Sequence, residues 1–232
     1  VSPWGVAYVA MNSLLWVTGE LMSIAFFGHA AVVGMIVGCG WALLGNRVFR
    51  VLLFPFLYLY FMVPEGEFLV PHLQDLTAAV LVKALRATGI PVFIEGRYLA
   101  IPSGNFVVAE ACSGINYLIA TLAVGAMFMY LNFVAWWRRL LFMLVAVAVP
   151  LVANGLRAYG IVMIAHLSDY KYAMGVDHFI YGWVFFGIVI FALFALGNLF
   201  SDVDTAPSRP VPVPGRPAPA GALGLILACL VL

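Results

Sequence analysis

Charged side chains are scarce in this sequence. Only 9% of its 232 residues are Asp, Glu, Lys or Arg, whereas 65% are hydrophobic, and soluble domains carry about 25% charged residues. We therefore expect a polytopic membrane protein whose main partner is the lipid bilayer, which takes up the apolar surface. The formal net charge of +1 gives no indication of nucleic-acid binding.

Cysteine is scarce too. The chain has three cysteines, none in a CxxC pair, which argues against a disulfide framework or a zinc site, so no metal or other cofactor is predicted. Cys39 and Cys229 are flanked by apolar residues and glycine, where cysteine acts as a small hydrophobic side chain. An initiator Met is also lacking and the last residues are apolar, so we expect a piece of a longer protein.

Long apolar stretches dominate what is present. A membrane-spanning helix needs about 20 apolar residues, within a range of about 17–25. Pro55 lies in the shortest of the candidate stretches and predicts a kink or a change of tilt there. We expect an all-α bundle of about six transmembrane helices, with a partial seventh from about residue 221; the six cover 3–18, 22–45, 48–63, 113–135, 140–165 and 179–200.

Basic residues between these stretches predict the orientation. Arg47 and Arg50 follow the second stretch, and Arg138 and Arg139 lie between the fourth and the fifth. Loops rich in Lys and Arg stay in the cytoplasm, and two crossings separate these loops, so both predict the same topology. Residues 64–112 and the outer ends of the last three stretches then lie on the extracytoplasmic face.

Residues 64–112 are too polar for a span. Within 71–90, apolar residues at helical spacing predict an amphipathic helix that lies on the membrane or caps the bundle; they are Leu73, Leu76, Val80 and Leu85. In 91–114, alternating residues predict short strands and a hairpin, with turns at Gly96 and at Pro102-Ser103-Gly104.

Three domains follow from these patterns. Residues 1–200 form the predicted transmembrane domain. Residues 201–220 are rich in proline, which is typical of a semi-rigid linker, here on the cytoplasmic side. Residues 221–232 are interpreted as the start of a further transmembrane segment or of a fused C-terminal domain.

Polar residues near the spans are the candidate functional residues, because such groups are costly in a membrane. The predicted topology brings Cys112, Arg157 and His178 to one membrane face, at the ends of three consecutive spans. A cation lowers the pKa of a thiol, a histidine can move its proton, and an arginine can stabilise an oxyanion. Asn154 shares a helix face with Arg157 and could orient either that residue or a substrate. Asp177 directly precedes His178.

Two residues flank the thiol. Ser113 is expected to N-cap the helix that follows, which would put Cys112 at a helix N-terminus where the dipole favours the thiolate. Glu110 could pair with Arg157 or be solvated.

Structural roles remain open alternatives. Arg157 could be an anchor at the membrane interface, and a lone interfacial histidine is more often structural than catalytic. His166 is the competitor for the histidine role, although it should lie further out along the helix of Arg157. His29 and His72 have no evident partner.

Four segments resemble the exosortases, which are multi-pass membrane relatives of the archaeosortases. Their order and spacing carry the resemblance, which covers about residues 40–200; they are "FPFLYLYFMVPEGEFLVPHLQDLTA" (54–78), "EACSGINYL" (110–118), "VPLVANGLRAYGI" (149–161) and "DHFIYGWVFF" (177–186). The resemblance implies a Cys–Arg–His site in the bacterial inner membrane, open to the periplasm, with Cys112, Arg157 and His178 as catalytic residues. Tyr181 falls in the last segment and is a supporting residue.

The resemblance also implies a reaction and a substrate. Family members are thought to process exported proteins that end in a Pro-Glu-Pro-type motif, an apolar helix and a basic cluster. Cys112 would form a thioester at the motif and release the tag, and a second nucleophile would take the acyl group. Cell-wall sortases use the same three residue types on an unrelated fold, which would be convergence.

Two other functions stay open. Water could resolve the thioester, which would make the protein a protease. Alternatively, the protein is a non-enzymatic subunit or transporter of an exopolysaccharide export system, and such machinery is also a possible partner of the enzyme.

Overall fold

The structure is a computed structural model that describes residues 1–63, 66–168 and 176–202, with residues 176–181 described by their backbone only. The chain divides into two compact units. The first has its described residues in 1–63 and the second in 66–202. The predicted seventh span and all but the first two residues of the predicted linker lie outside the described residues.

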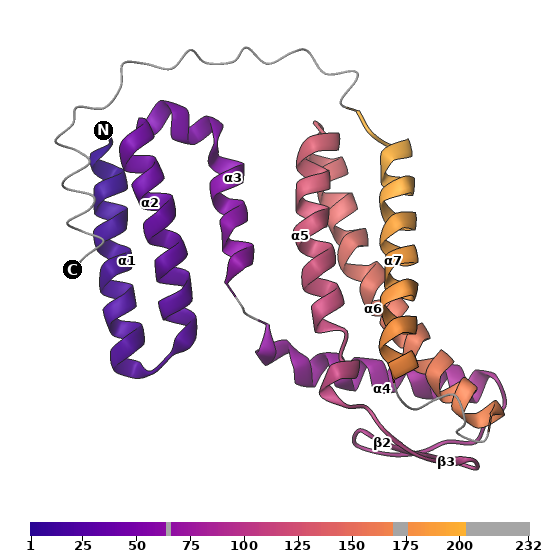
Figure 1. Cartoon of the computed structure of the whole chain (residues 1–232). Coiled ribbons are helices and arrows are strands. Elements are labelled where there is room, and N and C mark those ends of the chain that lie inside the picture. The colour runs from indigo at the N-terminus through magenta and orange to yellow at the C-terminus, as the bar shows by residue number, and fades with distance from the viewer. Residues whose placement is uncertain (64–65, 169–175, 203–232) are drawn as a thin grey trace. The chain divides into compact units, whose positions relative to one another are not determined.

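The first unit is built on a helical hairpin. Helices α1 (Pro3–Met22) and α2 (Ala25–Val51) run antiparallel (Figure 1). Small residues let their backbones approach closely, as is common between membrane helices: a Cβ atom added to Gly38 would lie 2.7 Å from the Val9 side chain. The hairpin therefore depends on glycine at its contact face.

The predicted third span is not a single helix. The chain bends at Gly45, whose φ of 75° interrupts α2, and again at Leu52. A short apolar helix follows, made of α3 (Leu53–Tyr58) and the 3-10 helix η1 (Leu59–Met62). Pro55 lies in the first turn of α3, where proline is tolerated. The change of direction therefore comes before the proline rather than at it.

The second unit contains three long helices side by side, α5 (Ile115–Asn132), α6 (Trp136–Leu167) and α7 (Val176–Leu199). Helix α4 (Val70–Ala87), preceded by the 3-10 helix η2 (Glu67–Leu69), runs across one end of them (Figure 1). Its buried face, which includes Leu81 and Leu85, belongs to the core of the unit. The amphipathic capping helix predicted from the sequence is thus present.

A small sheet covers this capping helix. The prediction of a hairpin was incomplete, because three strands form an antiparallel meander: β1 (Phe93–Glu95), β2 (Tyr98–Ile101) and β3 (Gly104–Val107). The two turns fall where they were predicted, at Gly96 and before Gly104. One core cluster joins Leu99 of β2 to Leu85 of α4 and to Ala158 and Val162 of α6.

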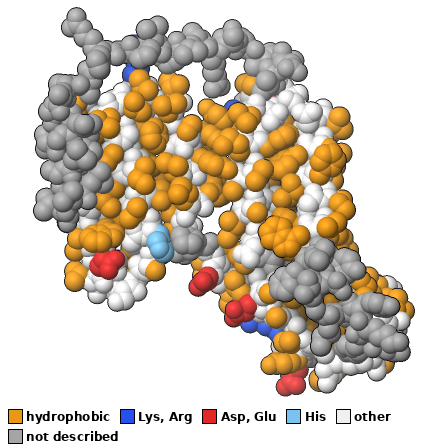
Figure 2. Space-filling view, in the orientation of Figure 1, with side chains coloured by type: hydrophobic (Ala, Val, Ile, Leu, Met, Phe, Trp, Pro, Cys, Tyr) orange, Lys and Arg blue, Asp and Glu red, His pale blue; other side chains and the backbone are white. Residues whose placement is uncertain are grey.

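Five of the described helices are long and apolar enough to cross a membrane, judged by length and composition; they are Ala25–Val51, Glu67–Ala87, Glu110–Asn132, Trp136–Leu167 and Gly182–Leu199. The predicted first span forms α1, which is not one of the five. Hydrophobic side chains cover much of the helix surfaces (Figure 2). The chain is therefore an all-α polytopic membrane protein embedded in the lipid bilayer.

Helix α6 is longer than a bilayer requires. Its 32 residues extend about 48 Å at 1.5 Å per residue, whereas the hydrocarbon core is about 30 Å thick. The surplus carries Ala158 and Val162, which pack in the cluster formed with α4 and the sheet. The same helix thus crosses the membrane and holds the cap.

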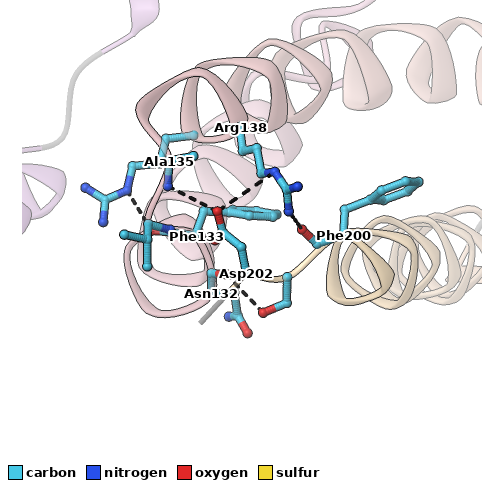
Figure 3. A network of polar contacts seen from close by, with 9 residues as sticks. Asn132, Phe133, Ala135, Arg138, Phe200 and Asp202 are labelled. Atoms are coloured by element: carbon cyan, nitrogen blue, oxygen red, sulfur yellow. Dashed lines mark hydrogen bonds and ion pairs between the residues drawn. The ribbon is translucent and has the colours of Figure 1, made fainter. Parts of the chain in front are cut away.

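A polar clamp closes the other end of the bundle (Figure 3). The Asp202 carboxylate, just after α7, accepts hydrogen bonds from the backbone N–H groups of Val134 (2.7 Å) and Ala135 (3.2 Å). Arg138 donates to the Phe200 carbonyl at 2.9 Å, and its Nε lies 3.8 Å from Asp202. The hydrogen bond from Val134 is the main reason that the pKa of Asp202 lies below its ordinary value.

Candidate active site

Cys112 lies where the cap joins the helix bundle. It ends the 3-10 helix η3 (Glu110–Cys112), and Gly114 then N-caps α5. The N-cap prediction for Ser113 was off by one residue: Ser113 is buried, and its Oγ accepts a 3.4 Å hydrogen bond from the Ile115 N–H. The Cys112 thiol is free and half-buried, against the core shared by the sheet, α4 and α6.

Gly114 cannot be replaced without strain. Its φ of 79° lies in the left-handed region, which costs other residues about 1–2 kcal/mol. A Cβ atom there would lie 2.6 Å from Cγ of Asn154. The backbone beside the thiol therefore packs directly on the Asn154 amide.

Asn154 connects the separate parts of the site. This side chain on α6 is only 4% exposed. Its Nδ2 donates to the Cys112 carbonyl at 2.8 Å and to Thr77 Oγ1 at 3.0 Å, while its Oδ1 accepts from Arg157 Nη2 at 3.2 Å. One buried amide thus fixes the main chain at the cysteine, the capping helix and the arginine.

The capping helix contributes two polar residues that sequence reasoning missed. Thr77 and Gln74 are both buried, and Gln74 Nε2 donates to the Val108 carbonyl at 2.9 Å, four residues before the cysteine. Both lie on the apolar face of α4, where a buried polar residue needs a partner. That break in the apolar face is the signal that could have revealed them.

Arg157 is held by an aromatic contact and by Asn154, and no carboxylate among the described side chains pairs with it. Its guanidinium lies over the Tyr117 ring, at 5.2 Å from the ring centroid, and Tyr117 packs against Phe186 of α7 at 4.2 Å. Its Nε is buried and has no hydrogen-bond partner among the described residues. A buried donor without a partner is rare in native proteins, so we expect an acceptor for this Nε outside the described side chains, either in the chain or in a bound substrate.

Helix α7 approaches this arginine at a glycine. A Cβ atom on Gly182 would lie 2.9 Å from the Tyr117 hydroxyl and 3.3 Å from Nη1 of Arg157. His178 lies four residues earlier in α7, which is about one helical turn. The side chains of Asp177, His178 and Tyr181 lie outside the described residues.

Positions along the helices put Arg157 and His178 at similar distances from the end of the bundle that carries the clamp. Arg157 follows Trp136, the start of α6, by 21 residues, and His178 precedes Leu199, the end of α7, by 21 residues. At 1.5 Å per residue both distances are about 32 Å, close to the thickness of the hydrocarbon core. Cys112 lies just before α5, at the same end of the bundle.

Other predicted residues do not join this group. Glu110 is exposed and forms no ion pair with Arg157. His166 Nδ1 hydrogen bonds Ser103 Oγ at 2.9 Å, so it ties the β2–β3 turn to α6. His29 and His72 are exposed. Within the described part of the chain, no three His, Cys, Asp or Glu side chains gather to hold a metal.

The fold and this site are those of a multi-pass helical membrane protein with a thiol, a buried amide and an arginine at one end of its bundle. The sequence model of the transmembrane exosortase family (Exosortase_EpsH) matches residues 1–195, and the chain belongs to this family. No curated protein and no solved structure matches the chain.

Proposed function

We propose that this exosortase is a membrane cysteine peptidase and transpeptidase that removes a C-terminal sorting tag from exported proteins. The Cys112 thiolate attacks the carbonyl carbon at the sorting motif, so that an S–C bond forms and the C–N peptide bond breaks. His178 gives a proton to the leaving amine, and the tag departs. Water or an amine then attacks the thioester, and the Cys112 thiol is restored.

The Asn154 network carries this proposal. Its amide joins the main chain at Cys112, in η3, to the guanidinium of Arg157, which lies with Asn154 on α6. The buried Nε of Arg157 has no acceptor in the described part of the chain, and an oxyanion formed at the attacked carbonyl would supply one. A site of low hydration makes such a charged donor more effective.

The arginine positions support an orientation. With Arg138 and Arg139 in the cytoplasm, the cysteine end of the bundle faces the periplasm of a bacterial inner membrane. A substrate anchored by its own apolar helix, with basic residues after it, would then present the bond before that helix at the depth of Cys112. An exopolysaccharide system could supply the acceptor.

The test is processing of a tagged reporter by membranes that contain the full chain. Cys112→Ala and Cys112→Ser should both abolish processing while the protein still inserts, whereas Cys39→Ala in α2 should process normally. Normal processing by Cys112→Ala would sink the proposal in favour of a non-enzymatic subunit or transporter. Mass spectrometry of the product separates hydrolysis from transfer to an amine.

A further inference from the structure

An apolar groove runs between α6 and α7 at the end of the bundle that carries the clamp. Its volume is about 540 Å³. One wall is formed by residues of α6 that are four positions apart and so share a helix face: Trp137, Leu141, Val145 and Val149. The opposite wall is formed by α7 and includes Val189 and Leu196. The groove lies away from the cysteine end.

The dimensions of the groove fit a hydrocarbon chain. From Trp137 to Val149 the wall extends about 18 Å at 1.5 Å per residue, compared with about 15 Å for one leaflet of the hydrocarbon core. A single acyl chain can therefore lie along this wall over the length of one leaflet.

The mouth of the groove carries its one charged lining residue, Arg138. Two of its nitrogens are engaged, Nη1 by the Phe200 carbonyl and Nε at 3.8 Å from Asp202 (Figure 3). A guanidinium has five N–H donors, so donors remain for a phosphate. Trp136 and Trp137 beside it are 73% and 52% exposed, as is common for aromatic residues at the lipid headgroups.

We propose that this groove binds one acyl chain of an anionic phospholipid, whose phosphodiester is held by Arg138. The apolar wall recognises the chain, and the guanidinium matches the phosphate. The net anionic headgroup is preferred because Arg138 and Arg139 together outnumber Asp202 at this end. The site does not depend on the proposed peptidase activity.

Native mass spectrometry of the full chain tests the headgroup. The chain is taken from vesicles with equal phosphatidylglycerol and phosphatidylcholine, and the retained lipid is measured. The wild type should retain phosphatidylglycerol preferentially, and Arg138→Gln should lower the amount of retained phosphatidylglycerol about tenfold, since the loss of a hydrogen bond to a charged group has about that effect. Arg139→Gln makes the same change in net charge outside the groove and should lower that amount less. Equal retention by the wild type, or equal losses in both variants, would overturn the site.

Filling the groove tests the acyl chain. Ala192 lines the groove, whereas Ala195, on the same helix, does not. Ala192→Phe should abolish retention of the lipid, and Ala195→Phe should leave it unchanged. Unchanged retention by Ala192→Phe contradicts the proposal. A photocrosslinker at Val145 should label lipid, and a product that joins it to residues 221–232 would show instead that the chain fills its own groove.

Discussion

The arginines at the two ends of the α5–α7 bundle have different contacts. At one end, Arg138 forms an ion pair with Asp202 and donates a hydrogen bond to the Phe200 carbonyl. At the other end, Arg157 packs on Tyr117 and bonds Asn154, but no carboxylate among the described side chains pairs with it. The first arginine has its charge partner within the clamp, and the second has a buried Nε that finds no hydrogen-bond partner among the described residues.

This difference separates an arginine whose charge partner lies within the protein from one without a described charge partner. The clamp uses Nη1 and Nε of Arg138 to join α6 to the chain after α7, where Asp202 is its charge partner. At the cysteine end, the neutral amide of Asn154 orients Arg157, and no carboxylate among the described side chains lies within ion-pair distance of it. That arrangement suits an arginine whose acceptor arrives with a substrate.

The largest expected effect comes from neutralising each arginine in turn. Arg157→Gln should lower the rate of tag removal by about 10²–10³-fold, the loss seen when a donor to an oxyanion is removed. Arg138→Gln, at the other end, should process at a nearly normal rate. A processing assay on membranes with matched protein levels measures both. Equal losses would mean that both arginines are structural.

A pair of glycines tests how tightly the cysteine loop is packed. Gly114→Ala should destabilise the protein by about 1–2 kcal/mol from backbone strain and also displace Asn154, so processing should fail. Gly96 has a φ of 59° and open space where a Cβ atom would lie. Gly96→Ala should therefore strain the backbone in the same way but leave processing of the reporter unchanged. Thermal unfolding and the reporter assay together give the result. If both variants process alike, the contact with Asn154 has no role at the site.

The Tyr117 ring gives a smaller effect. Tyr117→Phe keeps the cation–π contact with Arg157, whereas Tyr117→Leu removes it, at a cost of about 0.5–2 kcal/mol. We expect Tyr117→Leu to lower kcat by a few-fold with little change in KM, and Tyr117→Phe to resemble the wild type. A loss in Tyr117→Phe equal to that in Tyr117→Leu would point to the hydroxyl instead.

The smallest effect is a pH response confined to the clamp. The pKa of Asp202 is lowered in the folded protein, so its stabilisation is complete above its ordinary pKa of about 3.9 and is lost as the pH falls through the lowered value. Hydrogen exchange at Val134 and Ala135 should therefore speed up in strong acid relative to intrinsic rates. In Asp202→Asn, the Val134 and Ala135 amides should exchange fast at every pH. The backbone amides around Asn154 should show no increase of exchange in acid.

Much of this architecture could be predicted from local patterns. Apolar runs located α2, α5, α6 and α7, amphipathic spacing gave α4, and the turn at Gly96 was correct. The break at Gly45 falls where the second predicted span ends, directly before Asn46 and Arg47. The second predicted turn, at Pro102-Ser103-Gly104, precedes the third strand, although only a hairpin was predicted.

The site was predictable by residue type but not by geometry. The positions of the basic loops predicted that Cys112, Arg157 and His178 lie at one membrane face. The described backbone, which places all three at the same end of the bundle, is consistent with this prediction. The contact between Asn154 and Thr77 joins residues 77 positions apart, which no local pattern encodes. Asn154 itself was expected to orient Arg157, and the hydrogen bond between them confirms that contact. The catalytic roles stay predictions.

The most direct test is to find the acyl group on the cysteine. The full chain is mixed with a tagged substrate, quenched in acid, digested and analysed by mass spectrometry. We predict an acyl adduct on the peptide that contains Cys112, removed by hydroxylamine and absent in Cys112→Ser. Tag removal at a normal rate with the adduct on another residue, or with none detectable under conditions that trap thioesters, would contradict the assignment of Cys112 as the nucleophile.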